Sequence, residues 1–329
     1  MTRAARRGAL GAVVVAAAIQ FAPGPATGQN PQFSQWLDEV RQEALGRGIS
    51  EPVLESALNG LSLIPRVIEL DRQQPEFTLT FRQYMDRVVP AARVENGRQR
   101  MRENAGLLTE IGAAYGVQPR FVTALWGIES DFGRITGGFP VIASLATLAF
   151  DGRRSAYFRG ELMDALAIID GKHITLDKMT GSWAGAMGQS QFMPSSFLAF
   201  ALDHDGDGRK DIWNTKADVF ASAANYLKRS GWNGDQTWGR PVRLPSAFDP
   251  ALADLAVRKR LSEWHKLGVR RADGGDLPTR DLMASIVIPD GPDGPAFVVY
   301  DNFRVILKWN RSTYFAIAVG SLADRLAGG

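Results

Sequence analysis

The 329-residue sequence contains no cysteine and only three histidines. The absence of cysteine excludes disulfides, Cys-based metal sites and lipid attachment through an N-terminal cysteine. The histidines, His173, His204 and His265, show no metal-ligand spacing, and we assign them no role. The sequence also lacks the G-x-S-x-G, P-loop and G-x-G-x-x-G motifs, so it carries none of these signatures of hydrolases or nucleotide-binding proteins.

Long apolar runs are absent as well, apart from a short one near the N-terminus. Three arginines within the first seven residues precede an apolar run at residues 9–18, and small residues follow at Ala26 and Gly28. This order is typical of a secretory signal peptide, which we place at residues 1–28. An uncleaved membrane anchor is the alternative, but the run is well short of the roughly 20 residues that a spanning helix needs. We therefore expect export to the periplasm, with no membrane span in the mature chain.

A strong excess of one charge is also missing. Of the 38 basic residues, three lie within residues 1–28, where there is no acidic residue, so the remainder has 35 basic against 35 acidic side chains. The mature chain is close to neutral, which removes the electrostatic argument for nucleic-acid binding. We expect no nucleic-acid partner.

Hydrophobic periodicity predicts a mostly helical α+β protein. We expect a helical lobe at residues 29–115, whose last helix runs from about Val94 to Tyr115 and ends at Gly116. A core at 116–235 follows, and a C-terminal helix at 303–329 returns to that core. The other expected helices cover residues 121–130, 145–149, 157–169 and 218–229.

The composition changes after Gly239, where proline, glycine and short β-favouring runs predominate. Residues 284–288 and 296–300 predict two strands joined by a Pro- and Gly-rich turn. We therefore expect a small β lobe at residues 236–302. Ser312 is placed to cap the final helix, which extends through Leu326.

Glu129 is the first candidate catalytic residue. It lies near the C-terminal end of an apolar helix, beside Trp126 and before Phe132. A partly desolvated carboxyl has a raised pKa, which suits a general acid at neutral pH. Taken alone, the residue is more readily explained as a helix-end carboxylate paired with Arg134 or Lys172.

A glycine-rich segment at residues 181–197 is the second candidate. Its closely spaced glycines let backbone approach a ligand, and Gln191 supplies both hydrogen-bond donors and acceptors. Ser195 or Ser196 is placed to cap the following helix. The aromatic residues Trp183, Phe192 and Tyr226 suit stacking on sugar rings, although a structural turn over core residues explains the segment as well.

Asp203, Asp205 and Asp207 stand at alternate positions before Gly208, as in the first half of an EF-hand calcium loop. The usual glutamate at position 12 is replaced by Asn214. Asp218 is a candidate later ligand, and Arg209 offers its backbone carbonyl. We predict a structural Ca²⁺ in this acidic loop, residues 203–218; a solvated acidic turn is the alternative.

Together these motifs resemble the lytic murein transglycosylases of the membrane-bound transglycosylase B type, glycoside hydrolase family 103. The resemblance is carried by residues 126–133, 182–196 and the acidic loop running into 223–227. It implies a lysozyme-like core with an added helical lobe and a small β lobe around a glycan groove. It further implies cleavage of the β-1,4 bond between N-acetylmuramic acid and N-acetylglucosamine, which leaves 1,6-anhydro ends.

The resemblance also assigns residues. Glu129 matches the single catalytic acid/base of the family. The positions that match the groove are Ser182, Gln191, Tyr226 and Asn310, with Tyr84 and Tyr157 as further candidates. The positions that match the calcium loop are Asp203, Asp205, Asp207, Arg209 and Asp218, although the spacing before Asp218 is one residue longer than in the family pattern.

The lack of a lipid-anchor cysteine predicts a soluble periplasmic monomer. Its expected partners are peptidoglycan strands and other cell-wall enzymes. Two other functions stay open at this point. A hydrolytic muramidase would need a second carboxylate about 5–9.5 Å from Glu129. A non-catalytic, calcium-dependent glycan-binding protein would need no acid/base at all.

Overall fold

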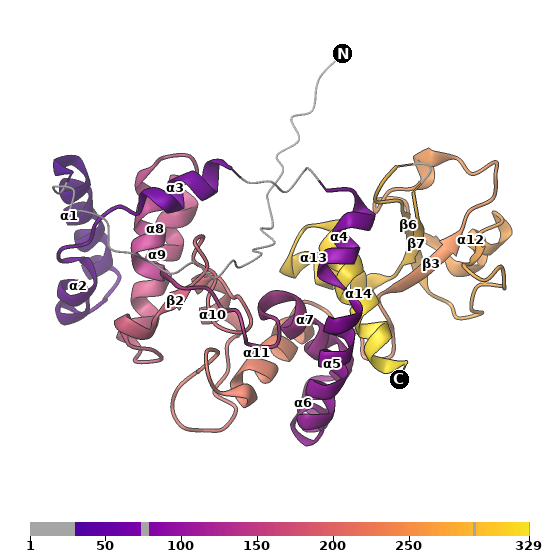
Figure 1. The fold of residues 1–329 in the computed structure, drawn as a ribbon, viewed down its shortest axis with the longest axis horizontal. Coiled ribbons are helices and arrows are strands. Elements are labelled where there is room, and N and C mark those ends of the chain that lie inside the picture. Colours follow the sequence, from indigo (N-terminus) through magenta and orange to yellow (C-terminus); the bar gives the residue numbers. More distant parts are fainter. Residues whose placement is uncertain (1–29, 74–78, 292–293, 329) are drawn as a thin grey trace, which may run out of the picture. The chain divides into compact units, whose positions relative to one another are not determined.

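The computed structural model describes residues 30–73, 79–291 and 294–328 (Figure 1). The predicted signal peptide at residues 1–28 lies outside the described residues. Helices account for most of the described chain and strands form two small sheets, which confirms the predicted, mostly helical α+β class.

The chain divides into two compact units. The first takes in the described residues of 76–124 and 227–329, and the second those of 14–75 and 125–226. The predicted helical lobe is distributed over both, because its first three helices belong to the second unit and the next three to the first. The domain boundaries drawn from the sequence stay a prediction.

Helices dominate the second unit. They are α1 (Pro31–Gly46), α2 (Glu51–Leu58), α3 (Pro65–Arg72), α8 (Val141–Phe150), α9 (Ser155–Asp170) and α10 (Pro194–Phe200), with most of α11 (Lys216–Arg229) and the last half of α7 (Pro119–Ser130). Helices α8 and α9 lie side by side (Figure 1). Helix α8 is buried on nearly every side, which matches its mostly apolar sequence. Strands β1 (Phe139–Pro140) and β2 (Thr180–Gly181) pair antiparallel.

The first unit combines helices with a five-stranded antiparallel sheet. Its helices are α4 (Phe81–Val88), α5 (Ala91–Glu103), α6 (Ala105–Tyr115), α12 (Leu261–Lys266), α13 (Asp301–Trp309) and α14 (Thr313–Ala327). The strands β3 (Gly239–Arg243), β4 (Lys259–Arg260), β5 (Arg270–Arg271), β6 (Met283–Val287) and β7 (Ala296–Val299) follow the order β4-β6-β7-β3-β5. The two strands expected from sequence, β6 and β7, pair as neighbours, with Ser285 opposite Val299.

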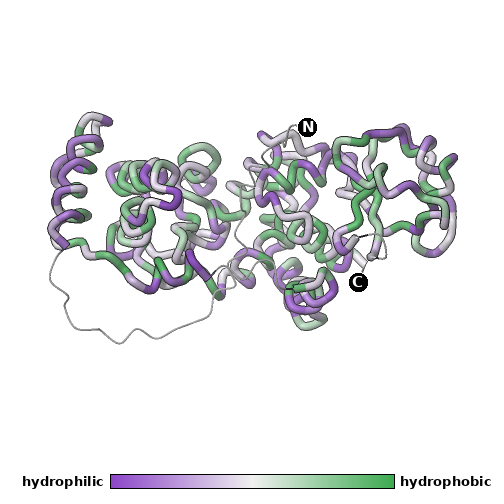
Figure 2. Tube along the Cα trace, turned by 90° about the horizontal axis from the view of Figure 1, so that it is seen from above, coloured by the Kyte–Doolittle hydropathy of each residue, from purple (hydrophilic) through white to green (hydrophobic). Residues whose placement is uncertain are grey.

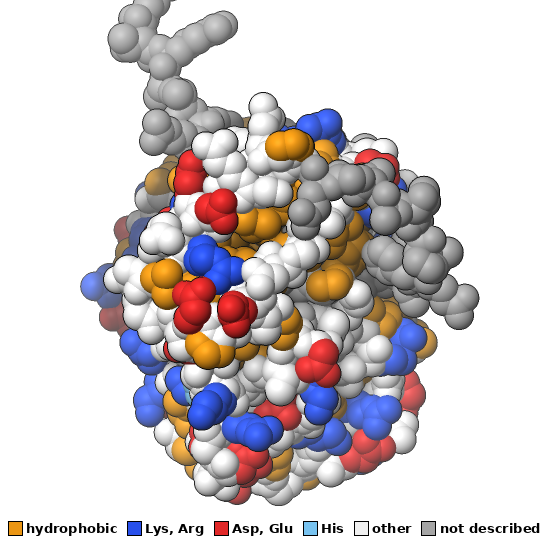
Figure 3. All heavy atoms as spheres, turned by 90° about the vertical axis from the view of Figure 1, so that its left-hand side faces the viewer, with side chains coloured by type: hydrophobic (Ala, Val, Ile, Leu, Met, Phe, Trp, Pro, Cys, Tyr) orange, Lys and Arg blue, Asp and Glu red, His pale blue; other side chains and the backbone are white. Residues whose placement is uncertain are grey.

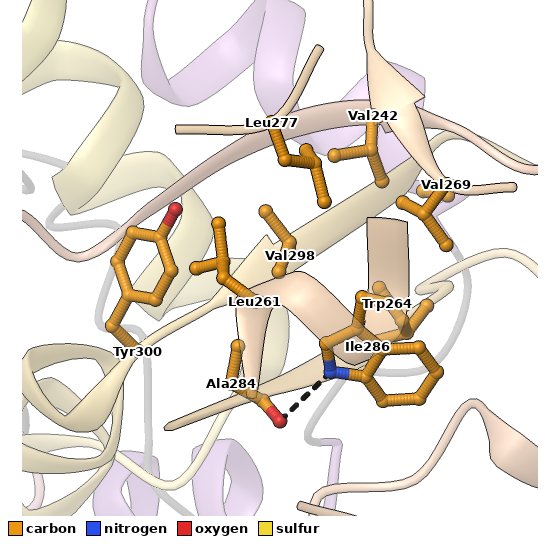
Figure 4. Packing of buried hydrophobic residues seen from close by; sticks show 10 residues of the cluster. Val242, Leu261, Trp264, Val269, Leu277, Ala284, Ile286, Val298 and Tyr300 are labelled. Carbon is orange, nitrogen blue, oxygen red and sulfur yellow. Dashed lines mark hydrogen bonds between the residues drawn. The ribbon is translucent and has the colours of Figure 1, made fainter. Parts of the chain in front are cut away.

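The β lobe has a hydrophobic core of its own. Trp264 from α12 is fully buried among Ile286, Val298 and other apolar side chains (Figure 4). Its indole N–H donates to the carbonyl oxygen of Ala284 at 3.1 Å, so the one polar atom of the ring is satisfied inside the core. The short predicted lobe is therefore held by side chains from both α12 and the sheet.

Two local expectations need correction. The helix expected from Val94 to Tyr115 is two helices, because Asn104 leaves helical geometry and its side-chain amide donates to the Arg100 carbonyl at 2.7 Å. Gly116 ends the second of them in the left-handed conformation, as expected. The helix that begins at Pro194 has Met193 as its N-cap residue in place of the expected serine, and its Ser195 N–H donates to the Glu161 carboxylate at 2.9 Å.

Other local signals are confirmed. The Ser312 hydroxyl accepts a hydrogen bond from the Phe315 N–H at 3.3 Å and caps α14. Among the described residues, no helix is both long and apolar enough to span a membrane. Hydrophilic and hydrophobic residues instead alternate along the helices (Figure 2).

Candidate functional site

Glu129 is half-buried in the last turn of α7. The helix stops abruptly, because Asp131 and Phe132 both adopt left-handed backbone, with φ of 50° and 60°. Such conformations in non-glycine residues cost about 1–3 kcal/mol each and persist only where surrounding contacts hold them. The Phe132 N–H reaches back to the Trp126 carbonyl at 3.2 Å, and the two rings meet edge to face.

Of the two basic residues suggested as partners for Glu129, Arg134 forms an ion pair elsewhere. Arg134 forms an ion pair with Asp131, with 2.6 Å between Nη2 and Oδ2. Asp131 is also the carboxylate nearest to Glu129 in sequence. The ion pair of Asp131 with Arg134 therefore stabilises the chain reversal that follows α7.

The glycine-rich segment forms a tight series of turns. The buried Ser182 hydroxyl accepts from the Ala186 N–H at 3.0 Å. Gln191 has left-handed backbone (φ 47°), and its side-chain amide donates to the carbonyls of Thr136 and Gly188 at 3.0 and 2.8 Å. The contact with Thr136 ties this segment to the loop that follows Glu129.

Gln189, which the sequence did not single out, is the residue that joins these parts. It is buried, and its side-chain oxygen accepts from the Trp126 indole N–H at 2.8 Å. Its amide donates to the Trp213 carbonyl at 2.8 Å. In the sequence it is one of two glutamines two residues apart, and nothing local distinguishes the one that faces inward.

Two of the predicted groove tyrosines lie in the same unit as Glu129. Tyr226 is buried, with its ring 4.5 Å from that of Phe200 and 5.9 Å from that of Phe192, and burial raises its pKa. Tyr157 is half exposed on α9 and hydrogen-bonds to Glu161. Burial, together with the Glu161 charge, raises the pKa of Tyr157, which keeps the phenol protonated at neutral pH.

The other two predicted groove residues belong to the first unit. Tyr84 is buried, with its ring 5.5 Å from that of Tyr314. Asn310 is buried at the end of α13, and its side-chain oxygen accepts from the Ser312 N–H at 3.0 Å. The structure describes each unit by itself, so the assignment of these two residues to a common groove stays a prediction.

The acidic loop brings three of its predicted ligands together. One carboxylate oxygen from each of Asp203, Asp205 and Asp218 can be chosen so that all three lie within 4.8 Å of one another. Asp207 is outside this group, and its Oδ1 accepts from the Arg209 N–H at 2.8 Å. Asp218, despite its unusual spacing, is therefore brought to the first half of the loop.

Asp218 is the buried member of this group. It lies in the first turn of α11, and its two oxygens accept from the N–H groups of His204 and Asp211, each at 2.7 Å. Burial is the main reason that its pKa is raised, and the charges of Asp205 and Asp203 raise it further. Oxygen ligands that repel one another in this way fit a hard divalent cation such as Ca²⁺.

Charged side chains show no comparable concentration on the face drawn in Figure 3, where acidic and basic groups are interspersed.

Known proteins are similar to this chain over most of its length. The transglycosylase SLT domain model matches residues 32–324. The membrane-bound lytic murein transglycosylase B of Escherichia coli is 29% identical over 320 residues, which cover 91% of this chain and 83% of that protein.

Solved structures are also similar. SltB3 from Pseudomonas aeruginosa, in complex with NAG-anhNAM-pentapeptide, has a TM-score of 0.87 at 46% identity, covering 90% of this chain and 80% of that one. The Escherichia coli lytic transglycosylase Slt35, in complex with calcium, has a TM-score of 0.75 at 28% identity, covering 91% and 93%. Because the family model matches residues 32–324, most of the chain, this chain belongs to the transglycosylase SLT domain family.

Proposed function

We propose that this chain is a lytic transglycosylase that cleaves the β-1,4 bond between N-acetylmuramic acid and N-acetylglucosamine in peptidoglycan and leaves 1,6-anhydro ends. Membership of the family supports the reaction class, and a relative bound to an anhydro-muramyl fragment supports the product. The observation that carries the proposal is the half-buried Glu129 at the strained end of α7. Strained backbone of this kind concentrates at functional sites.

Glu129 is the proposed single acid/base. As the acid, it protonates the glycosidic oxygen while positive charge develops at C1 of the muramoyl residue. The N-acetyl carbonyl of the substrate stabilises that centre. As the conjugate base, Glu129 then takes the proton of the 6-hydroxyl, whose oxygen closes onto C1. This attack is intramolecular and therefore has a very high effective molarity.

The groove residues supply complementary polar groups. Ser182 accepts a backbone hydrogen bond through its oxygen, so its own hydroxyl proton is the group offered to a sugar. Gln191 uses its side-chain N–H groups on two carbonyls, so its amide oxygen is offered as an acceptor. Tyr226, Tyr157, Tyr84 and Asn310 complete the proposed sugar-binding set.

Calcium has a structural role in this proposal. Asp203, Asp205 and Asp218 would hold it through carboxylate oxygens, with Asp207 and the Arg209 carbonyl as further ligands. The ion would neutralise the repulsion among these groups and close the acidic loop. We further propose export to the periplasm, where the chain acts as a monomer on glycan strands beside other cell-wall enzymes.

The product distinguishes this proposal from a hydrolytic muramidase. Purified peptidoglycan is digested with the full chain, and the fragments are analysed by mass spectrometry. We expect 1,6-anhydro-muramoyl ends; reducing ends would establish a hydrolase. Binding of glycan with neither product would instead establish the non-catalytic alternative.

The replacement Glu129→Gln tests the acid/base role. It keeps the size of the side chain and removes the proton donor, so turnover should fall by at least about 10²–10⁴-fold. The melting temperature should stay close to that of wild type, because a neutral amide is tolerated at a half-buried helix end. Glu39→Gln, on the exposed face of α1, is the matched control and should keep full activity. Undiminished cleavage by Glu129→Gln would rule out the role.

A further inference from the structure

Gln189 contacts the helix of Glu129 at two points. Its side-chain oxygen accepts from the indole N–H of Trp126 at 2.8 Å, and its backbone carbonyl accepts from the Ser130 hydroxyl at 2.7 Å. Residues 126 and 130 are four apart on α7 and therefore lie on one helix face. The two bonds span the last helical turn, which contains Glu129.

The same residue also contacts the end of the acidic loop. Its backbone N–H donates to the Ile212 carbonyl, and its side-chain amide to the Trp213 carbonyl, both at 2.8 Å. Every polar group of Gln189 thus has a partner inside the second unit. One buried side chain with its peptide groups therefore joins α7 to the acidic loop through the glycine-rich segment.

Packing after the helix depends on Gln189 as well. The Gly133 N–H donates to the Ser130 hydroxyl at 3.1 Å, which in turn donates to Gln189. A Cβ atom on Gly133 would lie 2.2 Å from the Gln189 side-chain oxygen, so only glycine allows this approach. The left-handed residues Asp131 and Phe132 lie between these contacts, and strained backbone persists only where its surroundings determine it.

We propose that Gln189 is a positioning residue for the acid/base. By fixing Trp126 and Ser130, it fixes the orientation of the turn that carries Glu129, and it holds this turn against the acidic loop. The inference rests on the proposed function of Glu129. A carboxylate displaced by about 1 Å can lose about 10²-fold in rate, so small changes in this turn should affect turnover.

The variant Gln189→Met tests the inference. Methionine keeps the length of the side chain and removes the hydrogen bonds to Trp126 and Trp213. The matched control is Thr147→Val, another buried polar deletion in the second unit; the Thr147 hydroxyl accepts from the Ile64 N–H at 3.0 Å and donates to the Ala143 carbonyl at 2.7 Å. Both variants remove buried hydrogen bonds, but only one of them touches α7.

Two measurements are made on the full-length proteins. In hydrogen exchange, Gln189→Met should lose protection in a peptide covering residues 126–135, whereas Thr147→Val should keep it. In steady-state cleavage of glycan strands, Gln189→Met should lower kcat by about 10–100-fold with little change in KM. Thr147→Val should lower the melting temperature but leave kcat at the wild-type level.

The outcomes separate the inference from the proposed function. Unchanged exchange at residues 126–135 in Gln189→Met, or a kcat no lower than that of Thr147→Val, would overturn the positioning role. A raised KM at unchanged kcat would overturn it too, because it would make Gln189 a binding residue. Failure of the wild type to form anhydro ends would overturn the proposed function, while the exchange measurement would still report on Gln189.

Discussion

Gly137 and Gly138 are neighbours in sequence with very different surroundings. A Cβ on Gly137 would lie 2.1 Å from the carbonyl oxygen of Gly181, whereas one on Gly138 meets nothing within 4 Å. Gly137 also has a φ of 92°, a conformation that L-residues avoid. At this point the loop after Glu129 lies directly against the glycine-rich segment, so the absence of a side chain is required there.

We therefore expect Gly137→Ala to destabilise the protein by about 3 kcal/mol or more, because left-handed strain adds to a backbone collision. Gly138→Ala should change the free energy of unfolding by less than about 1 kcal/mol. Urea unfolding of both variants measures the difference. Equal stability of the two would contradict the close approach of Gly137 and Gly181.

Glu161 shows how a buried carboxylate takes a structural role. It accepts from the N–H and the hydroxyl of Ser195, at 2.9 and 2.7 Å, and thereby caps α10 from a different helix. Burial raises its pKa above 4.5 and outweighs the lowering by these hydrogen bonds. The folded protein therefore binds the Glu161 proton more tightly than the unfolded chain does.

This shift predicts the sign of a pH effect. The stability contributed by the raised pKa is fully present below pH 4.5 and is lost as the pH rises through the folded-state pKa. As the pH rises from about 3 to about 7, the melting temperature of Glu161→Gln should therefore increase relative to that of wild type.

Glu43 supplies a control of opposite sign, because its hydrogen bond to Arg159 lowers its pKa. Its stabilising contribution is present above pH 4.5 and is lost as the pH falls through the folded-state pKa. As the pH rises, the melting temperature of wild type should therefore increase relative to that of Glu43→Gln. The same trend in both variants would refute the assignment.

Among the elements, the acidic loop combines residues from its two ends. Asp203 and Asp205 are close in sequence, but Asp218 reaches them from the first turn of α11. Within the loop, Asp203 also accepts from the N–H groups of Gly206 and Gly208, at 2.7 and 2.8 Å. These bonds arrange the backbone, while the three carboxylates are left with mutual repulsion that a cation would relieve.

Calcium should therefore stabilise the protein. At a concentration 100 times the Kd, the expected gain is about 2.7 kcal/mol, which appears as a higher melting temperature in calcium than in a chelator. Asp218→Asn should strongly reduce that difference, because it removes the negative charge of the buried ligand. Asp38→Asn, on the exposed face of α1, should retain it. A wild type that melts identically in calcium and chelator would disprove the site.

Helix boundaries show which element signals can be read locally. The cap at Ser312 and the stop at Gly116 were predicted, because each depends on residues within one turn of the helix end. The break at Asn104 was missed, since the same residue type is also tolerated inside helices. The start of α10 was missed for a different reason: its cap is Glu161, which lies on another helix.

At the scale of the whole molecule, composition and periodicity were sufficient to predict the fold class. The mostly helical pattern predicted a helical protein, and the change of composition after Gly239 predicted the β lobe. The two strands expected from the sequence pair with each other. The strand order was beyond the sequence, because β3 lies between β7 and β5 through contacts over long separations. The two compact units likewise combine segments that are distant in the chain.

The sequence alone singled out Glu129, the glycine-rich segment and the start of the acidic loop as candidates, because helix ends, tight turns and alternating aspartates are short-range patterns. Tertiary structure alone decided that Gln189 joins these three parts. It also brought Asp218, which the sequence offered only as a candidate ligand, close to Asp203. The physical reason is the distance along the chain between the residues in contact. A buried hydrogen bond or ion pair forms between atoms that packing brings within about 3 Å of one another. For distant segments, the spacing along the chain does not specify which atoms meet in this way.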